Sequence, residues 1–314
     1  MRIFRHYADL PDSVRGAVVA VGNFDGVHLG HQALLVHARA LARDRGAPFA
    51  VMAFEPHPQE FFRPSPESFR LTPFRTKARL LAEAGADVLF ALPFDAQLAA
   101  KQAHEFVQDV LIDALDVTCV VVGGDFQFGK GRSGNTTTLS YMGEMEGFGV
   151  DIFGAVVGQG TEKISSSRIR IALKAGKPEE AAHLLGRYWA VESRIEHGDA
   201  RGRTIGFPTA NMRLVDTLAP AFGIYAVRVS ILDNDKVIGR HDGVANFGVR
   251  PMFETAQPLF ETYLFDFAGD LYGKHVSVEL VAWLRPEMKL EGLDALKAQI
   301  ARDCDAAKTA LAAS

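Results

Sequence analysis

Two histidines, His28 and His31, stand three residues apart near the start of the chain. They close the glycine-rich stretch Gly22–His31, which comes directly after the apolar run Ala17–Val21 and is followed by a helical pattern. Turns of this kind bind phosphate, because a helix N-terminus has free N–H groups and glycine lets the backbone approach a ligand. Two imidazoles on one face beside such groups predict a clamp for developing phosphate charge. A helix-capping pair and a weak metal site are the alternatives.

A second cluster lies in Ile164–Arg170, where three consecutive serines precede Arg168 and Arg170. Serine at a helix N-terminus is often only a cap. Arginine beside such a cap also makes an anion site, because its guanidinium can bind two phosphate oxygens at once. The pattern alone leaves both interpretations open.

Glycine motifs in residues 123–134 are rejected as nucleotide loops. A Walker A loop is nearly matched, but Gly131 stands where Ser or Thr would hold magnesium. A dinucleotide-binding fingerprint is matched as well, but no helix follows it at once, so the context that gives this motif its meaning is absent.

The second half of the chain carries a different set of polar residues. The glycine-rich turn His197–Gly206 offers a nest of N–H groups for phosphates, although a long hairpin loop is the simpler interpretation. Thr209 and Asn211 follow on an extended segment, so their side chains point to the same side. Both offer oxygen ligands, which suffice for magnesium that keeps other ligands from ATP and water. Glu261 lies in an alternating β-rich run and is a candidate general base; a solvated strand glutamate is the alternative.

The elements that must position these residues change character along the chain. In the first half, β-rich runs alternate with helical stretches, which predicts a parallel sheet with helices on its faces. The predicted strands are Ala17–Val21, Phe49–Phe54, Val88–Leu92, Thr118–Val122 and Val150–Val156, and the predicted helices are His31–Arg45, Thr76–Ala84 and Ala103–Leu115. Prolines at 64, 66 and 73 predict that Phe62–Pro73 forms a loop over one face of this domain.

After about residue 184, short β-rich runs follow one another with turns between them, which predicts an antiparallel barrel or sandwich. These runs are Tyr188–Ile195, Ile224–Leu232, Lys236–Ala245, Leu259–Phe267 and His275–Trp283. A closing amphipathic helix is predicted at Leu293–Ala313, and a connecting helix at Glu179–Leu185. The expected domains are residues 1–183 and 184–314.

Length and composition exclude several classes of protein. The 314 residues suggest two domains, and 48% apolar with 23% charged residues are typical of a chain with a folded core. A net charge of −4 gives no sign of nucleic-acid binding, which usually needs a basic excess. The only cysteines are Cys119 and Cys304, so a disulfide framework is excluded and a reducing compartment is favoured. With no signal-peptide pattern and no apolar run of about 18 residues, a cytoplasmic protein without a membrane anchor is expected. The sequence does not decide self-association.

Together these motifs resemble those of one enzyme family. Val21–His31 contains the His-x-Gly-His signature of nucleotidyltransferases, and its full form is similar to that of the bacterial bifunctional riboflavin kinase/FAD synthetases. The resemblance covers about residues 15 to 300 and includes, in the same order, Phe54–Pro58, Gly124–Gly129, Ile164–Arg170 and Gly206–Asn211. It implies an α/β chain with an N-terminal Rossmann-like nucleotidyltransferase domain and a C-terminal antiparallel β-barrel riboflavin kinase domain. The implied reactions phosphorylate riboflavin to FMN and adenylylate FMN to FAD, with ATP as co-substrate and Mg²⁺ as cofactor.

The resemblance also implies roles for individual residues. The expected catalytic residues are His28, His31, Arg168 and Glu261. The expected ATP-binding residues are Gly22, Asn23, Phe24, Gly30, Ser166, Ser167, Arg168, Gly198, Gly202, Arg203 and Gly206. The expected flavin-binding residues are Phe54, His57, Pro58, Asp125, Phe128 and Arg285, and the expected magnesium ligands are Thr209 and Asn211.

The chain departs from the family pattern at four positions. Gln127 stands where relatives commonly have Arg, Ser193 where kinases tend to have Gly, Tyr263 where His is usual, and Leu290 where an aromatic is usual. These departures motivate a first alternative, an FMN adenylyltransferase with an impaired kinase module. A second alternative is a non-catalytic flavin-binding regulator, which has no need of a general base and a pair of metal ligands.

Overall fold

The computed structural model describes all residues except 159–161, 197–205, 235 and 250–257. The described chain divides into two compact units, one made of Met1–Pro66 with Phe74–Ser165 and the other of Glu67–Pro73 with Ser166–Ser314. This division falls after Ser165, earlier than the expected domain boundary near residue 183, and it assigns a short N-terminal segment to the second unit.

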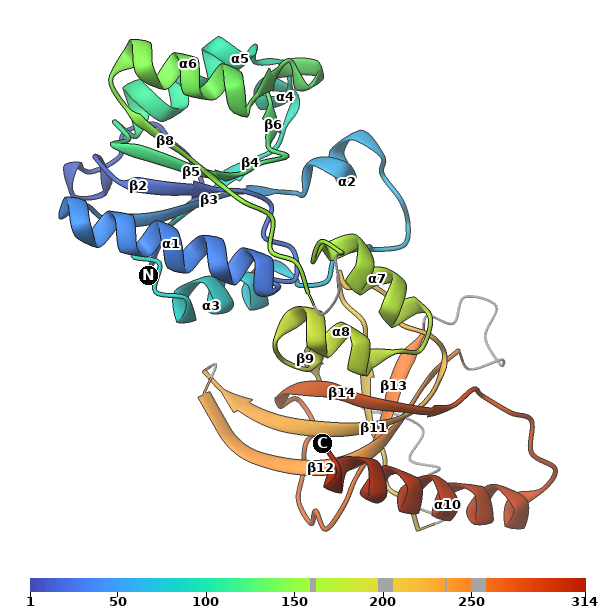
Figure 1. Cartoon of the computed structure of the whole chain (residues 1–314). Helices are drawn as coiled ribbons and strands as arrows, with labels where there is room; N and C mark the ends of the chain where they lie inside the picture. Colours follow the sequence, from blue (N-terminus) through green and yellow to red (C-terminus); the bar gives the residue numbers. More distant parts are fainter. Residues whose placement is uncertain (159–161, 197–205, 235, 250–257) are drawn as a thin grey trace. The chain divides into compact units, whose positions relative to one another are not determined.

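A six-stranded parallel sheet forms the centre of the first unit (Figure 1). In spatial order its strands are β1 (Arg2–Phe4), β4 (Val88–Pro93), β3 (Phe49–Glu55), β2 (Val18–Val21), β5 (Cys119–Gly123) and β8 (Gly149–Phe153). All four residues of β2 are buried, as expected for a central strand that is covered on both faces. The predicted strands are confirmed to within a few residues, and β1 was not predicted.

Helices cover both faces of this sheet (Figure 1). One face carries α1 (Leu29–Arg45) and α3 (Phe74–Glu83), whose buried side chains pack on the inward residues of β2 and β3. The other face carries α4 (Ala96–Ala100), α5 (Ala103–Phe106), the π-helical segment Val107–Ala114 and α6 (Thr136–Glu146). The short helix α2 (Pro58–Phe62) follows β3 directly.

The second unit is built on a six-stranded antiparallel sheet. In spatial order its strands are β10 (Ala210–Arg213), β13 (Leu259–Leu264), β12 (Lys236–Gly248), β11 (Gly223–Asp233), β14 (His275–Arg285) and β9 (Trp189–Arg194). The N–H of Glu196, just after β9, donates to the carbonyl of Asn211 on β10 at 2.9 Å, so the two edges of the sheet meet as in a barrel. Helix α10 (Leu293–Ala312) packs against β11, β12 and β14. The predicted barrel with a closing helix is confirmed.

Two further helices belong to this unit. Helix α7 (Ser166–Lys174) begins at the second of the three serines, and α8 (Pro178–Leu185) matches the predicted connecting helix. Proline at the first position of α8 and Gly186 in the left-handed region after it set the ends of that helix.

The segment Glu67–Pro73, here called the strap, is part of the second unit although it comes early in the sequence. Leu71 is fully buried, and the indole Nε1 of Trp189 donates to its carbonyl at 2.8 Å. The Nε of Arg170 donates to the carbonyl of Phe69 at 2.8 Å, and its guanidinium lies over the Phe69 ring. The expectation that the proline-rich loop lies over the first domain is therefore wrong for the strap.

Candidate active sites

The glycine-rich stretch of the first unit lies where the strand order of the parallel sheet reverses. From β2 the chain proceeds outward through β3 and β4 on one side, while β5 and β8 are added on the other. The carboxyl ends of strands at such a switch point are where open α/β sheets bind ligands. The turn after β2 is strained, because Phe24 and Val27 have φ angles of 50° and 40°. Strain of this kind is concentrated at functional sites.

The two imidazoles are stacked on each other at the start of α1. Their ring centroids are 3.6 Å apart, and the planes differ by 13°. The backbone N–H of His31 donates to Nδ1 of His28 at 3.2 Å, which makes His28 the N-cap of the helix. Because Nδ1 accepts a hydrogen bond, the neutral ring of His28 carries its proton on Nε2. The capping interpretation is therefore correct for Nδ1 of His28, which places the ring proton on Nε2.

His31 is held in its neutral form. Burial, the nearby His28, and the positive charges of Lys77 and Lys163 lower the pKa of His31 well below 6.5. Its Nδ1 is buried and has no hydrogen-bond partner among the described residues. The edge of the buried Phe24 ring lies against it, with centroids 5.2 Å apart. Phe24, expected to bind ATP, thus packs against His31 of the imidazole pair.

The remaining residues of the predicted stretch differ in their surroundings. Asn23 is exposed, and a side chain at Gly22 would meet the Phe24 ring at 3.2 Å. A Cβ atom at Gly30 would lie 3.1 Å from Cε1 of His28, so glycine leaves room for the imidazole.

A buried ion pair at the end of β3 was not predicted from the sequence. Nζ of Lys77, on α3, donates to Oε1 of Glu55 at 2.6 Å, and the two side chains are only 3% and 11% exposed. Glu55 ends the strand that neighbours β2, and Lys77 is close enough to His31 to lower its pKa. No local pattern marks Lys77, because helix α3 comes well after Glu55 in the sequence.

Aromatic rings gather on the expected flavin side of this site. Phe54, at the end of β3, contacts Phe94 with centroids 5.8 Å apart. Phe61 and Phe62 on α2 contact the same ring at 5.5 and 5.6 Å, and Phe62 is 64% exposed. His57 caps α2, because its Nδ1 accepts from the N–H of Gln59, and Pro58 is the first residue of that helix. Sequence reasoning included Phe54, His57 and Pro58 but missed the other three rings.

Asp125 follows β5 by two residues, and Phe128 ends the short strand β6 (Gln127–Phe128). The ammonium of Lys163 donates to Asp125 at 2.6 Å and lowers the pKa of that carboxyl. The Phe128 ring is buried and stacks on Phe126 with centroids 5.5 Å apart. Asp125 is therefore accessible to a ligand, whereas Phe128 contributes to the core beneath the site.

The serine-arginine motif starts helix α7 of the second unit. Ser167 is exposed, and Ser166 and Arg168 are half-buried in its first turn. The predicted hydroxyls and guanidinium are thus placed at a helix N-terminus, as an anion site requires.

In the second unit, one row of side chains crosses the antiparallel sheet. Asn211 on β10 is the direct cross-strand partner of Glu261 on β13. Glu261 is in turn the partner of Asn246 on β12, and the row continues through Ile224 to Arg285. Cross-strand partners lie on one face with Cβ atoms about 4.5–5.5 Å apart. The predicted metal ligand Asn211 and the predicted base Glu261 are therefore neighbours.

The other predicted site residues of this unit differ in their surroundings. Thr209 is half-buried and precedes β10 by one residue, and Gly206 is an exposed turn residue with φ of 91°. The guanidinium of Arg285 donates to both carboxylate oxygens of Asp303 on α10, at 2.8 and 2.6 Å. Its donors are thus directed at α10. The predicted ATP-binding residues Gly198, Gly202 and Arg203 lie outside the described residues.

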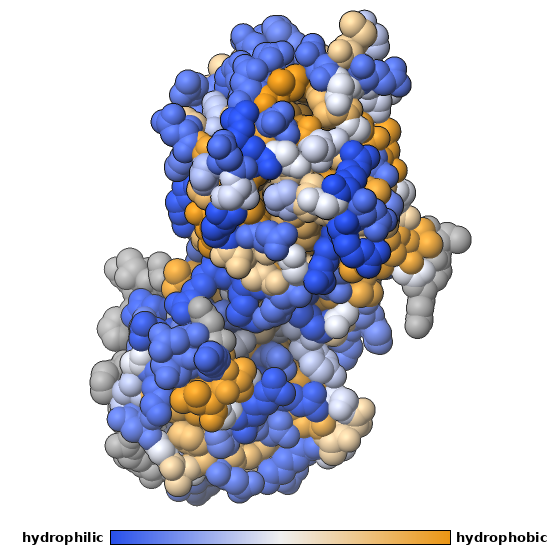
Figure 2. Space-filling view, turned by 90° about the vertical axis from the view of Figure 1, so that its left-hand side faces the viewer, coloured by the Kyte–Doolittle hydropathy of each residue, from blue (hydrophilic) through white to orange (hydrophobic). Residues whose placement is uncertain are grey.

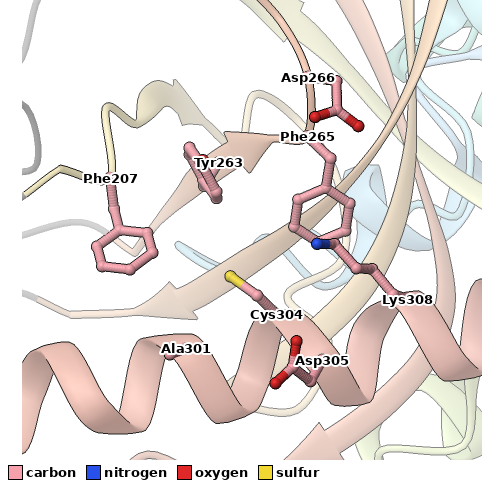
Figure 3. Close-up of a pocket in the computed structure, with 8 residues that line it drawn as sticks. All are labelled: Phe207, Tyr263, Phe265, Asp266, Ala301, Cys304, Asp305 and Lys308. Carbon is pink, nitrogen blue, oxygen red and sulfur yellow. The ribbon is translucent and has the colours of Figure 1, made fainter.

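An aromatic cavity of about 210 Å³ lies between this face of the sheet and α10 (Figure 3). It is lined by the rings of Phe207, Tyr263 and Phe265 and, from α10, by Cys304 and Lys308. Tyr263 is two residues from Glu261 on the same strand, so alternation places both on one face. The cavity therefore adjoins the row that carries Glu261.

Within the described part of the chain, no helix is both long and apolar enough to span a bilayer. On the face drawn in Figure 2, hydrophilic residues are interspersed with smaller hydrophobic patches.

Each unit has its own constellation of polar side chains, the stacked imidazoles of His28 and His31 in the first and the Asn211–Glu261 pair in the second, as expected of an enzyme with two sites. The family model of FAD synthetase matches residues 10–168, and that of riboflavin kinase matches residues 185–311. The chain is 41% identical over 304 residues to the bifunctional riboflavin kinase/FMN adenylyltransferase of Escherichia coli K12, covering 96% of each chain. It is 37% identical over 308 residues to that of Haemophilus influenzae, covering 98% of each. This chain belongs to the family of bifunctional riboflavin kinase/FMN adenylyltransferases.

A solved structure matches this chain over nearly its whole length. It is named as a macrolide-efflux protein from Streptococcus pneumoniae, and it matches this chain with a TM-score of 0.83 and 32% identity over 96% of each chain.

Proposed function

We propose that this chain makes FAD from riboflavin in two ATP-dependent steps at separate sites. The second unit phosphorylates riboflavin to FMN, and the first unit transfers AMP from ATP to FMN. The observation that carries this division is that each unit has its own constellation, the stacked imidazoles at the switch point and the Asn211–Glu261 pair on the antiparallel sheet.

In the adenylyl transfer, no covalent intermediate with the enzyme is needed, because the FMN phosphate is itself a nucleophile. One of its oxygens forms a bond with the α-phosphorus of ATP, and the bond from that phosphorus to the oxygen bridging to the β-phosphate breaks, releasing pyrophosphate. Nε2–H of His28 and the neutral ring of His31 then stabilise charge on the phosphates. The family resemblance assigns Ser166, Ser167 and Arg168, at the start of α7, to the binding of ATP phosphates as well.

The flavin of this first site is proposed to lie on the aromatic rings around Phe94. Phe61 and Phe62 are 38% and 64% exposed, so their rings can pack against a planar isoalloxazine, and Phe54 contacts the same Phe94 ring as Phe61. This placement puts the flavin at the carboxyl ends of β3 and β4, next to the switch point.

In the kinase step, Glu261 is the general base. It accepts the proton of the riboflavin 5′-hydroxyl while that oxygen forms a bond with the γ-phosphorus and the bond to the β–γ bridging oxygen breaks, releasing ADP. The cavity lined by Phe207, Tyr263 and Phe265 is proposed to receive the flavin ring. Tyr263 then supplies ring contact where relatives commonly have a histidine.

Magnesium fits the donor set beside Glu261. Thr209 and Asn211 offer a hydroxyl and an amide oxygen, which are the hard ligands this ion prefers. When bound, Mg²⁺ neutralises charge on the β- and γ-phosphates of ATP. Asn211 is 9% exposed and is the direct cross-strand partner of Glu261, so the two side chains share one face of the sheet.

We further propose that the enzyme works in the cytoplasm on small molecules rather than on nucleic acid or membranes. The net charge of −4 and the presence of only two cysteines support this assignment. The proposed domains are residues 1–183 and 184–314, whereas the compact units divide after Ser165 and place the strap in the second unit.

Separation of the products tests the division of labour. With riboflavin, ATP and magnesium, we expect the His28→Asn variant to accumulate FMN without FAD. We expect Glu261→Gln to form no FMN from riboflavin, yet to convert supplied FMN to FAD. If either substitution abolishes both activities in a folded chain, the proposed division is wrong. Absence of FMN formation in the unmodified chain would favour an impaired kinase.

A further inference from the structure

Asn246 occupies the position next to Glu261 in the polar row of the second unit. The two residues are direct cross-strand partners, Asn246 on β12 and Glu261 on β13. Asn211 flanks Glu261 on the opposite side, so the carboxylate lies between two amide side chains. Asn211 is a proposed magnesium ligand, whereas Asn246 takes no part in the reaction proposed above.

The side-chain oxygen of Asn246 is buried and has no hydrogen-bond partner among the described residues. A buried amide oxygen without a partner is unfavourable, because it has lost its hydrogen bonds with water and gained none in return. A buried polar atom without a partner needs an explanation. One explanation is a ligand that donates the missing hydrogen bond.

None of the nearest neighbours on this face supplies that donor. Across the strands, Asn246 lies between Ile224, which is apolar, and Glu261, which is an acceptor when ionised. Along β12, the residues two positions away on the same face are Val244 and Gly248. Among these described neighbours the side-chain oxygen of Asn246 has no donor, and Asn246 shares its face of the sheet with Glu261, the proposed base for the acceptor hydroxyl.

We propose that Asn246 binds the ribityl chain of riboflavin, its Oδ1 accepting a hydrogen bond from a hydroxyl next to the one that is phosphorylated. The proposal rests on the proposed role of Glu261. If the reacting hydroxyl meets that carboxylate, the adjacent hydroxyls of the chain come within reach of a partner whose Cβ atom is about 5 Å away. ATP has its own ligands on the Asn211 side of the row, so the substrate that Asn246 recognises is the flavin.

Steady-state kinetics of the whole chain tests this role. Asn246→Leu is close in size and has no polar atoms, and Asn246→Ser keeps a smaller hydroxyl. We expect kcat/KM for riboflavin to fall about tenfold in Asn246→Leu and less in Asn246→Ser, as the loss of one hydrogen bond to substrate predicts. The KM for ATP in the kinase reaction should be unchanged, which shows that the second unit remains folded, and adenylylation of supplied FMN should be unchanged as well.

Lumiflavin, which has the flavin ring without the ribityl chain, separates substrate binding from a structural role. As a competitive inhibitor, it should keep its inhibition constant in Asn246→Leu. Equal weakening of lumiflavin and riboflavin would overturn the proposal, and so would an unchanged kcat/KM for riboflavin or a shift confined to the KM for ATP.

Thr262→Val provides a matched control. The Oγ1 of Thr262 is also buried without a partner, but this residue alternates with Glu261 and so faces the other side of the sheet. Its loss should leave riboflavin kinetics unchanged. Glu261→Gln, assayed alongside, separates the proposed role of Glu261 from that of Asn246. Activity retained in that variant would disprove the proposed base, whereas loss there combined with normal kinetics in Asn246→Leu would disprove only the role of Asn246.

Discussion

At the scale of single residues, the imidazole pair depends on what surrounds it. His28 uses one nitrogen to cap α1 and keeps the other as a donor, and His31 is kept neutral by burial and nearby positive charge. A neutral ring is already stable in this buried site before a phosphate binds. A charged ring in the same place would carry the free-energy cost of losing its hydration. The sequence predicted the pair and its position at a helix start. It could not predict the neutral state of His31, because Lys77 and Lys163 come from distant parts of the chain.

Gly30→Ala tests how closely the His28 ring is fitted. The new methyl group would lie 3.1 Å from Cε1 of His28, so the ring must move by a few tenths of an ångström. We expect FAD formation from FMN to fall about tenfold, because small misplacements of catalytic groups are costly. Stability should not fall, since Ala is favoured over Gly in a helix by up to about 1 kcal/mol. Gly154→Ala is the control, because a Cβ atom there meets nothing within 4 Å.

The lowered pKa of His31 predicts a pH dependence of stability. Between that lowered pKa and 6.5, the unfolded chain binds a proton at this position and the folded chain does not. The free energy of unfolding therefore falls as the pH falls below 6.5, with a slope from this residue that approaches about 1.4 kcal/mol per pH unit. Urea unfolding of the first unit at pH 7 and pH 5.5 should show a smaller difference in His31→Gln than in the unmodified chain. An equal difference in His31→Gln and in the unmodified chain would show that His31 does not cause the pH dependence.

At the scale of elements, periodicity identified most strands and helices, but not how they pair. Alternation placed Glu261 on one face of its strand, yet it could not show that Asn211 and Asn246 are its partners, because register depends on the whole ladder. β10 was missed because its four residues follow a turn-rich stretch and carry little pattern. The buried pair between β3 and α3 was missed for a related reason, since no local signal joins Glu55 to Lys77.

Lys77→Met tests that pair. The substitution removes the Lys77 ammonium from the buried Glu55 carboxylate, and breaking a buried ion pair costs about 3–5 kcal/mol in comparable cases. We expect the midpoint of urea unfolding of the first unit to fall accordingly, and addition of Glu55→Gln to recover part of the loss. Arg79→Met is the matched control on the same helix. Its partner Glu83 is 58% exposed, so removal of this pair should cost less than about 1 kcal/mol. Similar losses in both variants would show that burial of the Lys77 pair is unimportant.

At the scale of the whole molecule, the two compact units are not two continuous stretches of chain. The sequence predicted two domains from the change of pattern near residue 184, and it had no means of assigning the strap, whose prolines are typical of any surface loop. The strap lies within the region that matches the FAD synthetase model, residues 10–168, yet Leu71 is buried in the second unit and binds Trp189. Stability of the second unit therefore depends on residues from the first half of the sequence.

Leu71→Ala tests this dependence in the full-length chain. Truncation of a fully buried leucine costs about 2–5 kcal/mol, and here the cost falls on the second unit because the strap packs there. We expect the temperature of half-inactivation to fall for riboflavin phosphorylation and to stay unchanged for FMN adenylylation. Leu81→Ala is the reciprocal control, since Leu81 is equally buried but lies in the core of the first unit under α3. It should lower the inactivation temperature of adenylylation and spare phosphorylation. If Leu71→Ala instead weakens adenylylation alone, the strap stabilises the first unit and its assignment to the second is wrong.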